Sequence, residues 1–141
     1  MNWDSNDEHS LALVAWRESR GEGQQGCIAT MWVCRNRATA WDKSPHDVIY
    51  GKNQFSSMSI PSDREFNLDP EQSIGVDRAM WEYCKGAAPA VISGATPDPT
   101  NGALWYENPR WDKSPWFLGH IRGNPQSHPV VARIGQQVFY R

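Results

Sequence analysis

Residues 5–21 read SNDEHSLALVAWRESRG. The pair Ser5-x-x-Glu8 is a capping-box pattern, which is typical of the first turn of a helix. Apolar residues then recur at helical spacing over residues 11–15, and Gly21 is a good residue for a left-handed C-cap. The stretch therefore predicts an amphipathic helix that packs one apolar face against a core.

Glu18 projects from that apolar face, because it follows Leu11 by seven residues and Val14 by four. Burial on such a face raises the pKa of a carboxyl group, and the partial negative charge at a helix C-terminus acts in the same direction. A glutamic acid kept protonated near neutral pH is the general acid that cleavage of a glycosidic bond requires. The same position also suits a structural ion pair with Arg35 or Arg37, and periodicity alone does not choose between the two.

Beyond this helix, the sequence signals place further helices in the first two-thirds of the chain. Start and stop residues indicate helices at about residues 24–38, 44–51 and 69–86. The intervening stretch 53–68 mixes Ser, Pro and Asn with single aromatic residues, and we expect a loop or a weak strand there.

The last third of the chain changes character. Residues 97–102 have turn chemistry, residues 103–107 form a strand candidate, and residues 130–141 are typical of a hairpin. Helices followed by a small antiparallel sheet predict an α+β fold, and the length of 141 residues suits a single domain over residues 1–141.

Composition excludes several classes of protein. The net charge of -2 argues against a nucleic-acid binder, which normally needs an excess of Lys and Arg. The longest wholly apolar run, residues 11–16, is far shorter than the ~20 residues of a membrane span. The acidic, polar N-terminus lacks the features of a signal peptide. We therefore expect a monomer that is made in a cytoplasm and does not insert stably into a membrane.

The three cysteines are predicted to be reduced core thiols. Cys27 and Cys34 are seven residues apart in one predicted helix, roughly 10 Å along its axis, which is too far for a disulfide. Cys84 has no evident partner. No zinc-ligand spacing occurs among the Cys and His residues, so we predict neither a metal nor a cofactor.

The chain contains eight Trp, an unusual number for its length. Flat aromatic faces stack on sugar rings, although most of these side chains can equally well fill the core. Trp105 and Tyr106, directly after the predicted turn, are the preferred candidates for a sugar-binding groove. Phe55 and Ser56 in the middle loop form a second candidate patch.

Several motifs resemble the SleB-type cell wall hydrolases, the spore-cortex-lytic enzyme family. They are WRESRGEG at residues 16–23, GCIA at 26–29 and VCRNR at 33–37. The family has Gly-Glu-Ala-Arg-Gly-Glu-Pro, then Gly-x-x-Ala, then Val-x-x-Asn-Arg. Arg17 and Gly23 depart from that pattern, because they stand where the family has Gly and Pro. The similarity continues, in order, at residues 54–56, 98–103, 134–135 and 138–140.

The resemblance implies a compact, lysozyme-like α+β domain that cleaves peptidoglycan glycan strands between N-acetylmuramic acid and N-acetylglucosamine. It also implies that Glu18 is the acid, which agrees with the argument from the helix face. We predict contacts with the substrate at eight further positions: Glu22, Phe55, Ser56, Asp98, Thr100, Gly102, Trp105 and Tyr106.

Two glycosidic chemistries fit these residues. By analogy with the family we favour a lytic transglycosylase, in which one carboxylate acts first as acid and then as base while the muramic acid 6-hydroxyl closes a 1,6-anhydro ring. A lysozyme-type hydrolase would recruit a second carboxylate, for which Asp63, Glu65 and Asp98 are candidates.

Other classes of function and the biological setting are weighed in the same way. A non-catalytic glycan-binding module would use the same aromatic residues, whereas a peptidase or amidase would need a zinc triad or an activated Cys. A bare catalytic domain without an export signal resembles a phage endolysin, made in the host cytoplasm and acting at the wall after release. A bacterial hydrolase trimmed to its catalytic domain is the alternative.

Overall fold

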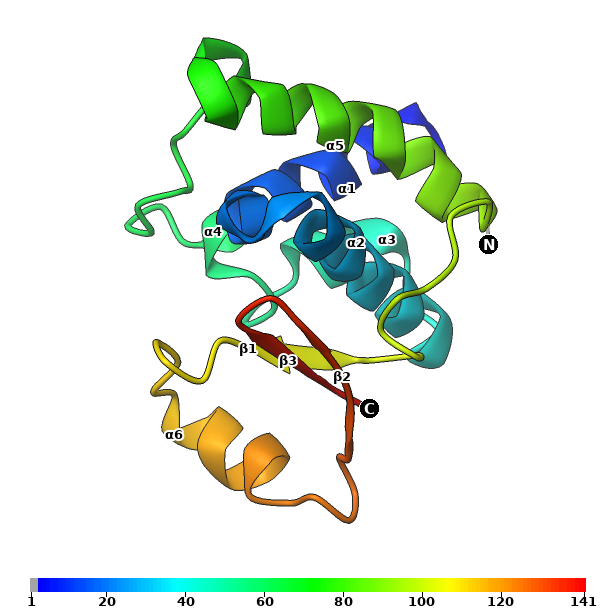
Figure 1. Cartoon of the computed structure of the whole chain (residues 1–141), viewed down its shortest axis with the longest axis vertical. Helices are drawn as coiled ribbons and strands as arrows, with labels where there is room; N and C mark the ends of the chain where they lie inside the picture. The colour runs from blue at the N-terminus through cyan, green and yellow to red at the C-terminus, as the bar shows by residue number, and fades with distance from the viewer. Residues whose placement is uncertain (1–2) are drawn as a thin grey trace.

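Three helices of fifteen residues or more make up the upper part of the molecule in Figure 1. They are α1 (Ser5–Ser19), α2 (Gly23–Ala40) and α5 (Gly75–Ser93) in a computed structural model that describes residues 3–141. Below them lies an antiparallel sheet with the strand order β1-β3-β2. Its strands are β1 (Trp105–Glu107), β2 (Val130–Ile134) and β3 (Gln137–Tyr140). The α+β prediction is confirmed.

The first helix starts as predicted but with a different capping pair. Asp4, not Ser5, is the N-cap: its carboxylate accepts the backbone N–H of Asp7 at 2.9 Å, and Asp7 returns the bond at 3.0 Å. A short 3₁₀ turn over Arg20–Glu22 joins α1 to α2. The positive φ that this bend needs falls on Gly23, at 78°, and not on Gly21.

Helix α5 lies further along the chain than the predicted range 69–86, because Asp69 caps a separate 3₁₀ turn at Pro70–Gln72. It begins at Gly75 and continues through Gly86 and Pro89 to Ser93, where Gly94 forms a left-handed cap with φ 82°. The predicted stop at Gly86 was wrong because buried residues on both sides of it, among them Cys84 and Ala88, keep the helix against the core. Tertiary packing here outweighs two local breakers.

The helical core is built on aromatic packing between α1 and α5. The rings of Trp16 and Trp81 meet edge to face at 6.4 Å, and both side chains are almost fully buried. The indole N–H of Trp16 donates to the carbonyl of Asp77 at 2.8 Å. The free thiols of Cys27, Cys34 and Cys84 are buried, as predicted.

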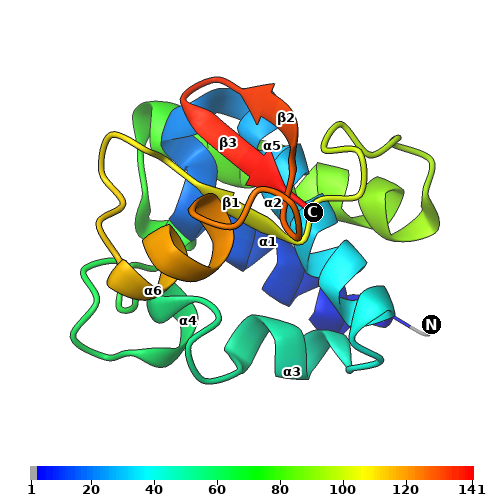
Figure 2. The same ribbon diagram turned by 90° about the horizontal axis from the view of Figure 1, so that it is seen from below.

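The sheet packs its upper face on α2 and its lower face on a short helical segment. Ala29 and Val33 of α2 contact Phe139 above the sheet. Below it, α6 (Pro115–Phe117) continues into a turn over Leu118–Arg122, and this segment lies beside the sheet when the molecule is seen from below (Figure 2). The predicted terminal hairpin is confirmed, and β3 also pairs with β1 along its other edge.

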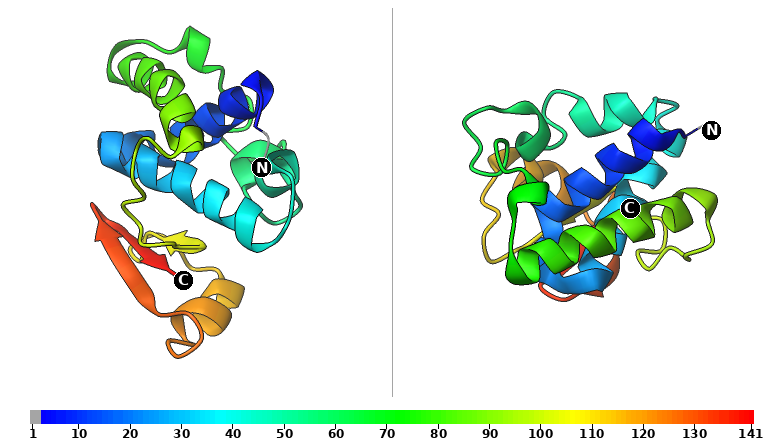
Figure 3. Two further views of the ribbon diagram at one scale, coloured as in Figure 1. Left: turned by 90° about the vertical axis from the view of Figure 1, so that its right-hand side faces the viewer. Right: turned by 90° about the horizontal axis from the view of Figure 1, so that it is seen from above.

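Shorter helices complete the frame around the middle loop. They are α3 (Pro45–Tyr50), α4 (Ser56–Ser59) and a 3₁₀ turn at Pro70–Gln72. The left view in Figure 3 shows the order of layers: α5 at the top, α1 and α2 beneath it, then the sheet, with α6 at the bottom. Over the described range, no helix is long and apolar enough to cross a membrane.

A buried polar cluster anchors the α6 segment beneath the sheet. The side chain of Glu107 is almost fully buried and accepts hydrogen bonds from Arg122, with 2.8 Å from Nε to Oε2, and from the hydroxyl of Tyr140. Arg122 lies in the segment that follows α6, and Tyr140 lies in β3. The cluster therefore joins three parts of the lower layer.

Glu107→Gln should lower the free energy of unfolding by about 2–3 kcal/mol, measured by urea denaturation, because the half-exposed Arg122 loses its buried ionic partner. Glu82→Gln is the matched control: its ion pairs with Arg78 and Lys85 lie on the surface of α5, so it should leave the stability almost unchanged. Equal effects of the two substitutions would contradict the anchoring role of Glu107.

Candidate active site

Glu18 lies in a cleft of about 250 Å³ between the helical layer and the sheet with α6. The cleft receives side chains from α1, α2, the loop before α4, β1 and the α6 segment. Its walls therefore come from stretches that are distant in the sequence. The lining residues are Glu18, Arg37, Asn53, Gln54, Phe55, Trp105, Tyr106, Asp112, Ser114, Trp116 and Phe117.

The surroundings of the Glu18 carboxyl group favour its protonated form more than water does. Burial raises the pKa of Glu18, and the negative charges of Asp63 and Asp112 act in the same direction, while the hydroxyls of Ser57 and Tyr106 lower it. The Tyr106 hydroxyl donates to Glu18 Oε1 at 3.0 Å. Burial also raises the pKa of Tyr106 well above its ordinary value, so this hydroxyl stays a donor.

The alternative of a structural ion pair does not describe Glu18. In the part of the chain that the structure describes, Glu18 takes part in no salt bridge. The guanidinium of Arg35 instead lies 4.5 Å from the ring centre of Trp32, and Arg37 Nε donates to the carbonyl of Leu104 at 2.6 Å. Within the described residues, the carboxyl of Glu18 therefore lines the cleft without a salt-bridge partner.

Arg37 places a buried positive charge in the same cleft. Its side chain is 5% exposed, and burial lowers its pKa. Nη1 donates to Gln54 Oε1 at 3.4 Å, and the guanidinium lies 5.0–5.3 Å from the ring centres of Trp41, Phe55 and Trp105. These contacts join α2, the middle loop and the start of β1 around one group.

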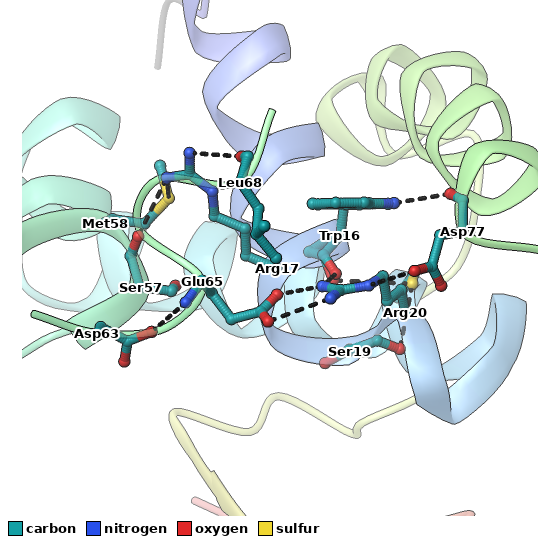
Figure 4. Close-up of polar contacts among 12 residues, drawn as sticks. Trp16, Arg17, Ser19, Arg20, Ser57, Met58, Asp63, Glu65, Leu68 and Asp77 are labelled. Atoms are coloured by element: carbon teal, nitrogen blue, oxygen red, sulfur yellow. Dashed lines mark hydrogen bonds and ion pairs between the residues drawn. The ribbon is translucent and has the colours of Figure 1, made fainter. Parts of the chain in front are cut away.

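A second hollow, of about 350 Å³, lies on the other side of Glu18 and is lined by charged residues. Figure 4 shows two arginines of α1 and the following turn that shape it. Arg17 donates to the carbonyls of Ser57 at 3.0 Å and Leu68 at 3.1 Å, which ties the middle loop to α1 (Figure 4). Arg20 pairs with Glu65 and lies 3.5 Å from Asp77.

The structure separates the predicted binding residues into two groups. Phe55, Trp105 and Tyr106 line the cleft beside Glu18. Ser56 does not line it: its side chain is exposed, and its hydroxyl donates to Asp63 Oδ2 at 2.6 Å.

Glu22 also lies outside the lining of the cleft, because its carboxylate faces the hairpin and accepts the backbone N–H of Gln136 at 3.4 Å. This contact links the turn after α1 to the loop between β2 and β3.

Asp98, Thr100 and Gly102 form a closed turn and do not line the cleft. Asp98 Oδ1 accepts the backbone N–H and the hydroxyl of Thr100 at 2.8 Å and 2.6 Å. Oδ2 accepts the N–H of Gly102 and the Asn36 side-chain amide, both at 3.0 Å. With its oxygens occupied, the Asp98 carboxylate fixes the chain on α2 just before β1, and so sets the positions of Trp105 and Tyr106.

The cleft contains a carboxylate that the sequence argument missed. Of the three predicted second carboxylates, Glu65 is paired with Arg20 and Asp98 is held in its turn. Asp63 accepts the backbone N–H of Glu65 at 2.8 Å, and its negative charge helps to raise the pKa of Glu18. Asp112 lines the cleft itself. No motif marked Asp112, because the fold alone brings its loop to α1.

Further lining residues had no distinctive sequence signal. They include Asn53, Gln54, Ser114, Trp116 and Phe117. Between residues 3 and 141, no group of three or more His, Cys, Asp or Glu side chains is placed to hold a metal ion.

The burial of Glu18 has a measurable effect on stability. Because its pKa is raised above the ordinary 4.5, the folded protein holds this proton to a higher pH than the unfolded chain, and stability is lost as the pH rises through that interval. Glu18→Gln removes the titration and keeps an oxygen that Tyr106 can bond. We expect the melting temperature of the variant, relative to wild type, to increase from about pH 4 to about pH 8.

Glu82→Gln is the control for this measurement. Ion pairs with Lys85 and Arg78 lower the pKa of Glu82, so its contribution to stability is present at higher pH, and its loss should produce a trend of the opposite sign. Parallel trends for the two variants would contradict the desolvation of Glu18.

Known proteins are similar to this chain in sequence and in architecture. The chain is 28% identical to the spore cortex-lytic enzymes of Bacillus subtilis strain 168 and Bacillus cereus over 139 residues, 97% of its length. That match spans only 38% and 45% of those relatives. The structure is similar to the catalytic domain of the germination-specific lytic transglycosylase SleB from Bacillus anthracis, with a TM-score of 0.72 and 27% identity over 99% of this chain and 98% of that domain.

A second solved structure, the catalytic domain of the Bacillus cereus SleB protein, gives a TM-score of 0.70 at 27% identity over 99% of this chain and 93% of that domain. The sequence model of the Cell Wall Hydrolase family matches residues 21–140. This match begins three residues after Glu18 and so does not include it. Residues 21–140 make up most of the chain, and the chain therefore belongs to the Cell Wall Hydrolase family.

Proposed function

We propose that this protein cleaves the glycan strands of peptidoglycan between N-acetylmuramic acid and N-acetylglucosamine, as a lytic transglycosylase with Glu18 as its acid and base. The observation that carries the proposal is a single desolvated carboxyl group in a cleft with aromatic walls. The names of the relatives, which include a lytic transglycosylase, support it.

In the proposed reaction, protonated Glu18 gives its proton to the glycosidic oxygen while the C1–O bond breaks through an oxocarbenium-like state. The ionised carboxylate then takes the proton of the muramic acid 6-hydroxyl, and that oxygen closes onto C1. Glu18 ends the cycle protonated, and no water is consumed. The Tyr106 hydroxyl, bonded to Glu18 Oε1, orients the carboxyl group and stabilises its ionised form between the two steps.

The remaining predicted residues take different parts in this proposal. Phe55, Trp105 and Tyr106 offer apolar ring surfaces to the strand beside Glu18. The hydrogen bonds of Asp98 with Thr100 and Gly102 fix the turn that precedes β1, and so position Trp105 and Tyr106. For Ser56 and Glu22, the observed contacts with Asp63 and Gln136 support positioning roles.

A lysozyme-type hydrolase is the second candidate, and Asp112 is the observation that favours it. A carboxylate in the same cleft could activate water or stabilise the oxocarbenium-like state. A role in lysis of a host cell by a phage stays a prediction, because the named relatives are spore enzymes and give it no support.

Glu18→Gln should reduce the clearing of a peptidoglycan suspension by about 10²–10⁴-fold, because the isosteric amide cannot give up a proton. Circular dichroism should show the wild-type fold. Glu82→Gln, on the surface of α5, should clear the suspension at the wild-type rate. Activity of Glu18→Gln within about tenfold of wild type would remove Glu18 from the role of acid. Failure of the wild type to clear the suspension, with binding retained, would indicate a glycan-binding module.

Mass spectrometry of the released muropeptides separates the two glycosidic chemistries. We expect ends of 1,6-anhydro-N-acetylmuramic acid, lighter by one water than a reducing end, because the substrate's own hydroxyl is the nucleophile. Reducing ends on muramic acid would instead indicate the hydrolase. In that case Asp112→Asn should abolish activity, whereas a transglycosylase should retain most of it.

A further inference from the structure

We propose that Trp116, together with Trp105, forms an outer sugar-binding subsite that extends the cleft away from Glu18 along α6. The ligand is a ring of the glycan strand itself, beyond the rings that contact Glu18. This inference rests on the proposed function for the identity of the strand. Trp105 was already a predicted contact, whereas Trp116 lies in a segment that no sequence motif marked.

A row of three aromatic rings leads from the end of α2 to the surface at α6. The ring centres of Trp41 and Trp105 are 5.5 Å apart, and those of Trp105 and Trp116 are 5.6 Å apart. Trp105 is only partly exposed, whereas Trp116 is 50% exposed. Both line the cleft that contains Glu18, so a polymer bound at Glu18 can continue across them.

The half-exposed ring of Trp116 is held in place from below. His120 stacks against it, with ring centres 5.1 Å apart and planes inclined by 17°. The His120 ring N lies 2.9 Å from the Trp116 carbonyl oxygen. One face of the indole is therefore covered while half of the side chain stays accessible. An aromatic ring fixed in this way loses little conformational freedom when a ligand stacks on it.

The backbone that carries Trp116 is also fixed. The Ser114 hydroxyl caps α6 by accepting the N–H of Phe117 at 3.4 Å, and Pro115 occupies the first turn. The ring of Phe117 meets that of Tyr140 edge to face at 5.7 Å, and Arg122 anchors the end of the segment on Glu107. These contacts with Tyr140 and Glu107 fix the α6 segment, and with it the position of the Trp116 ring at the surface.

The chemistry of the surroundings suits a sugar. The flat faces of a pyranose ring are apolar, and they stack on indole, while the ring edge carries hydroxyl groups. Asp112 and Ser114 line the same part of the cleft and can bond such hydroxyls. An apolar peptide side chain could use the indole but not these polar neighbours.

Trp111, in the loop that precedes α6, provides a matched control. It is 66% exposed, and the guanidinium of Arg110 lies 4.9 Å from its ring centre. It does not line the cleft. Trp111→Ala and Trp116→Ala therefore each remove one exposed indole ring, a few residues apart in the chain. Only Trp116→Ala removes a ring from the cleft in which we place the glycan strand.

The experiment measures binding by calorimetry in the Glu18→Gln background, where no ligand is cleaved. The probes are β-1,4-linked N-acetylglucosamine tetramers and hexamers, and peptidoglycan glycan strands stripped of their peptides. Trp116→Ala should weaken binding of the hexamer and the strands by about tenfold, and binding of the tetramer by less, because the subsite lies outward from Glu18. Trp116→Phe should restore most of the affinity, and Trp111→Ala should bind within about twofold of the parent.

Equal affinity of Trp116→Ala and its parent for the longest probe would overturn the subsite, as would an equal loss in Trp111→Ala. A loss seen only with strands that keep their peptides would assign the ring to the stem peptide and overturn the sugar assignment. Absence of binding to every peptide-free probe would also overturn the assignment of the subsite to a sugar.

Kinetics on the active enzyme keep this proposal apart from the proposed reaction. With Glu18 present, Trp116→Ala should raise KM and leave kcat and the 1,6-anhydro ends of the products unchanged. A wild type that cleaves nothing would overturn the reaction and leave the binding result standing. A wild type that cleaves while Trp116→Ala binds normally would overturn only the subsite.

Discussion

The buried guanidinium of Arg37 is the group on which the arrangement of the cleft depends. A buried cation needs hydrogen-bond acceptors or negative charges around it. Within residues 3–141, the Arg37 guanidinium forms no ion pair with a carboxylate. It is satisfied by the carbonyl of Leu104, the amide oxygen of Gln54 and the faces of three aromatic rings. Only an arrangement that brings α2, the middle loop and β1 together supplies all of these. The planar guanidinium group has several N–H donors that point in different directions, so it can contact partners on different sides. The ammonium group of a lysine is a compact point charge.

The sequence was sufficient where the physics is local or strictly periodic. The position of Glu18 on a buried face followed from the spacing of Leu11 and Val14, because helix geometry converts spacing directly into direction. The terminal hairpin followed from turn residues between two short apolar runs, and the register of Arg133 opposite Val138 agrees with it. Both depend on short segments of the chain.

Prediction from sequence was weaker wherever distant segments decide the outcome. Gly86 and Pro89 are proper stop signals, but their solvent-facing positions let α5 continue while Ala88 and Val91 pack inward. Asp98 has the chemistry of a binding residue, and the same chemistry serves equally well to close a turn, which is the role seen in its contacts with Thr100 and Gly102. Asp112 and Trp116 reach the cleft only because the segment around them folds beneath the sheet.

The bond from Tyr106 to Glu18 spans 88 positions of the chain. The first helix is synthesised well before the tyrosine and the strand that carries it, and β1 can pair with β3 only after β3 has been made. A chain that lacks β1 and β3 keeps Glu18 but loses part of the burial that raises the pKa of this carboxyl group. The acidity of Glu18 is therefore a property of the assembled fold, because residues near both ends of the described range have to pack together to produce it.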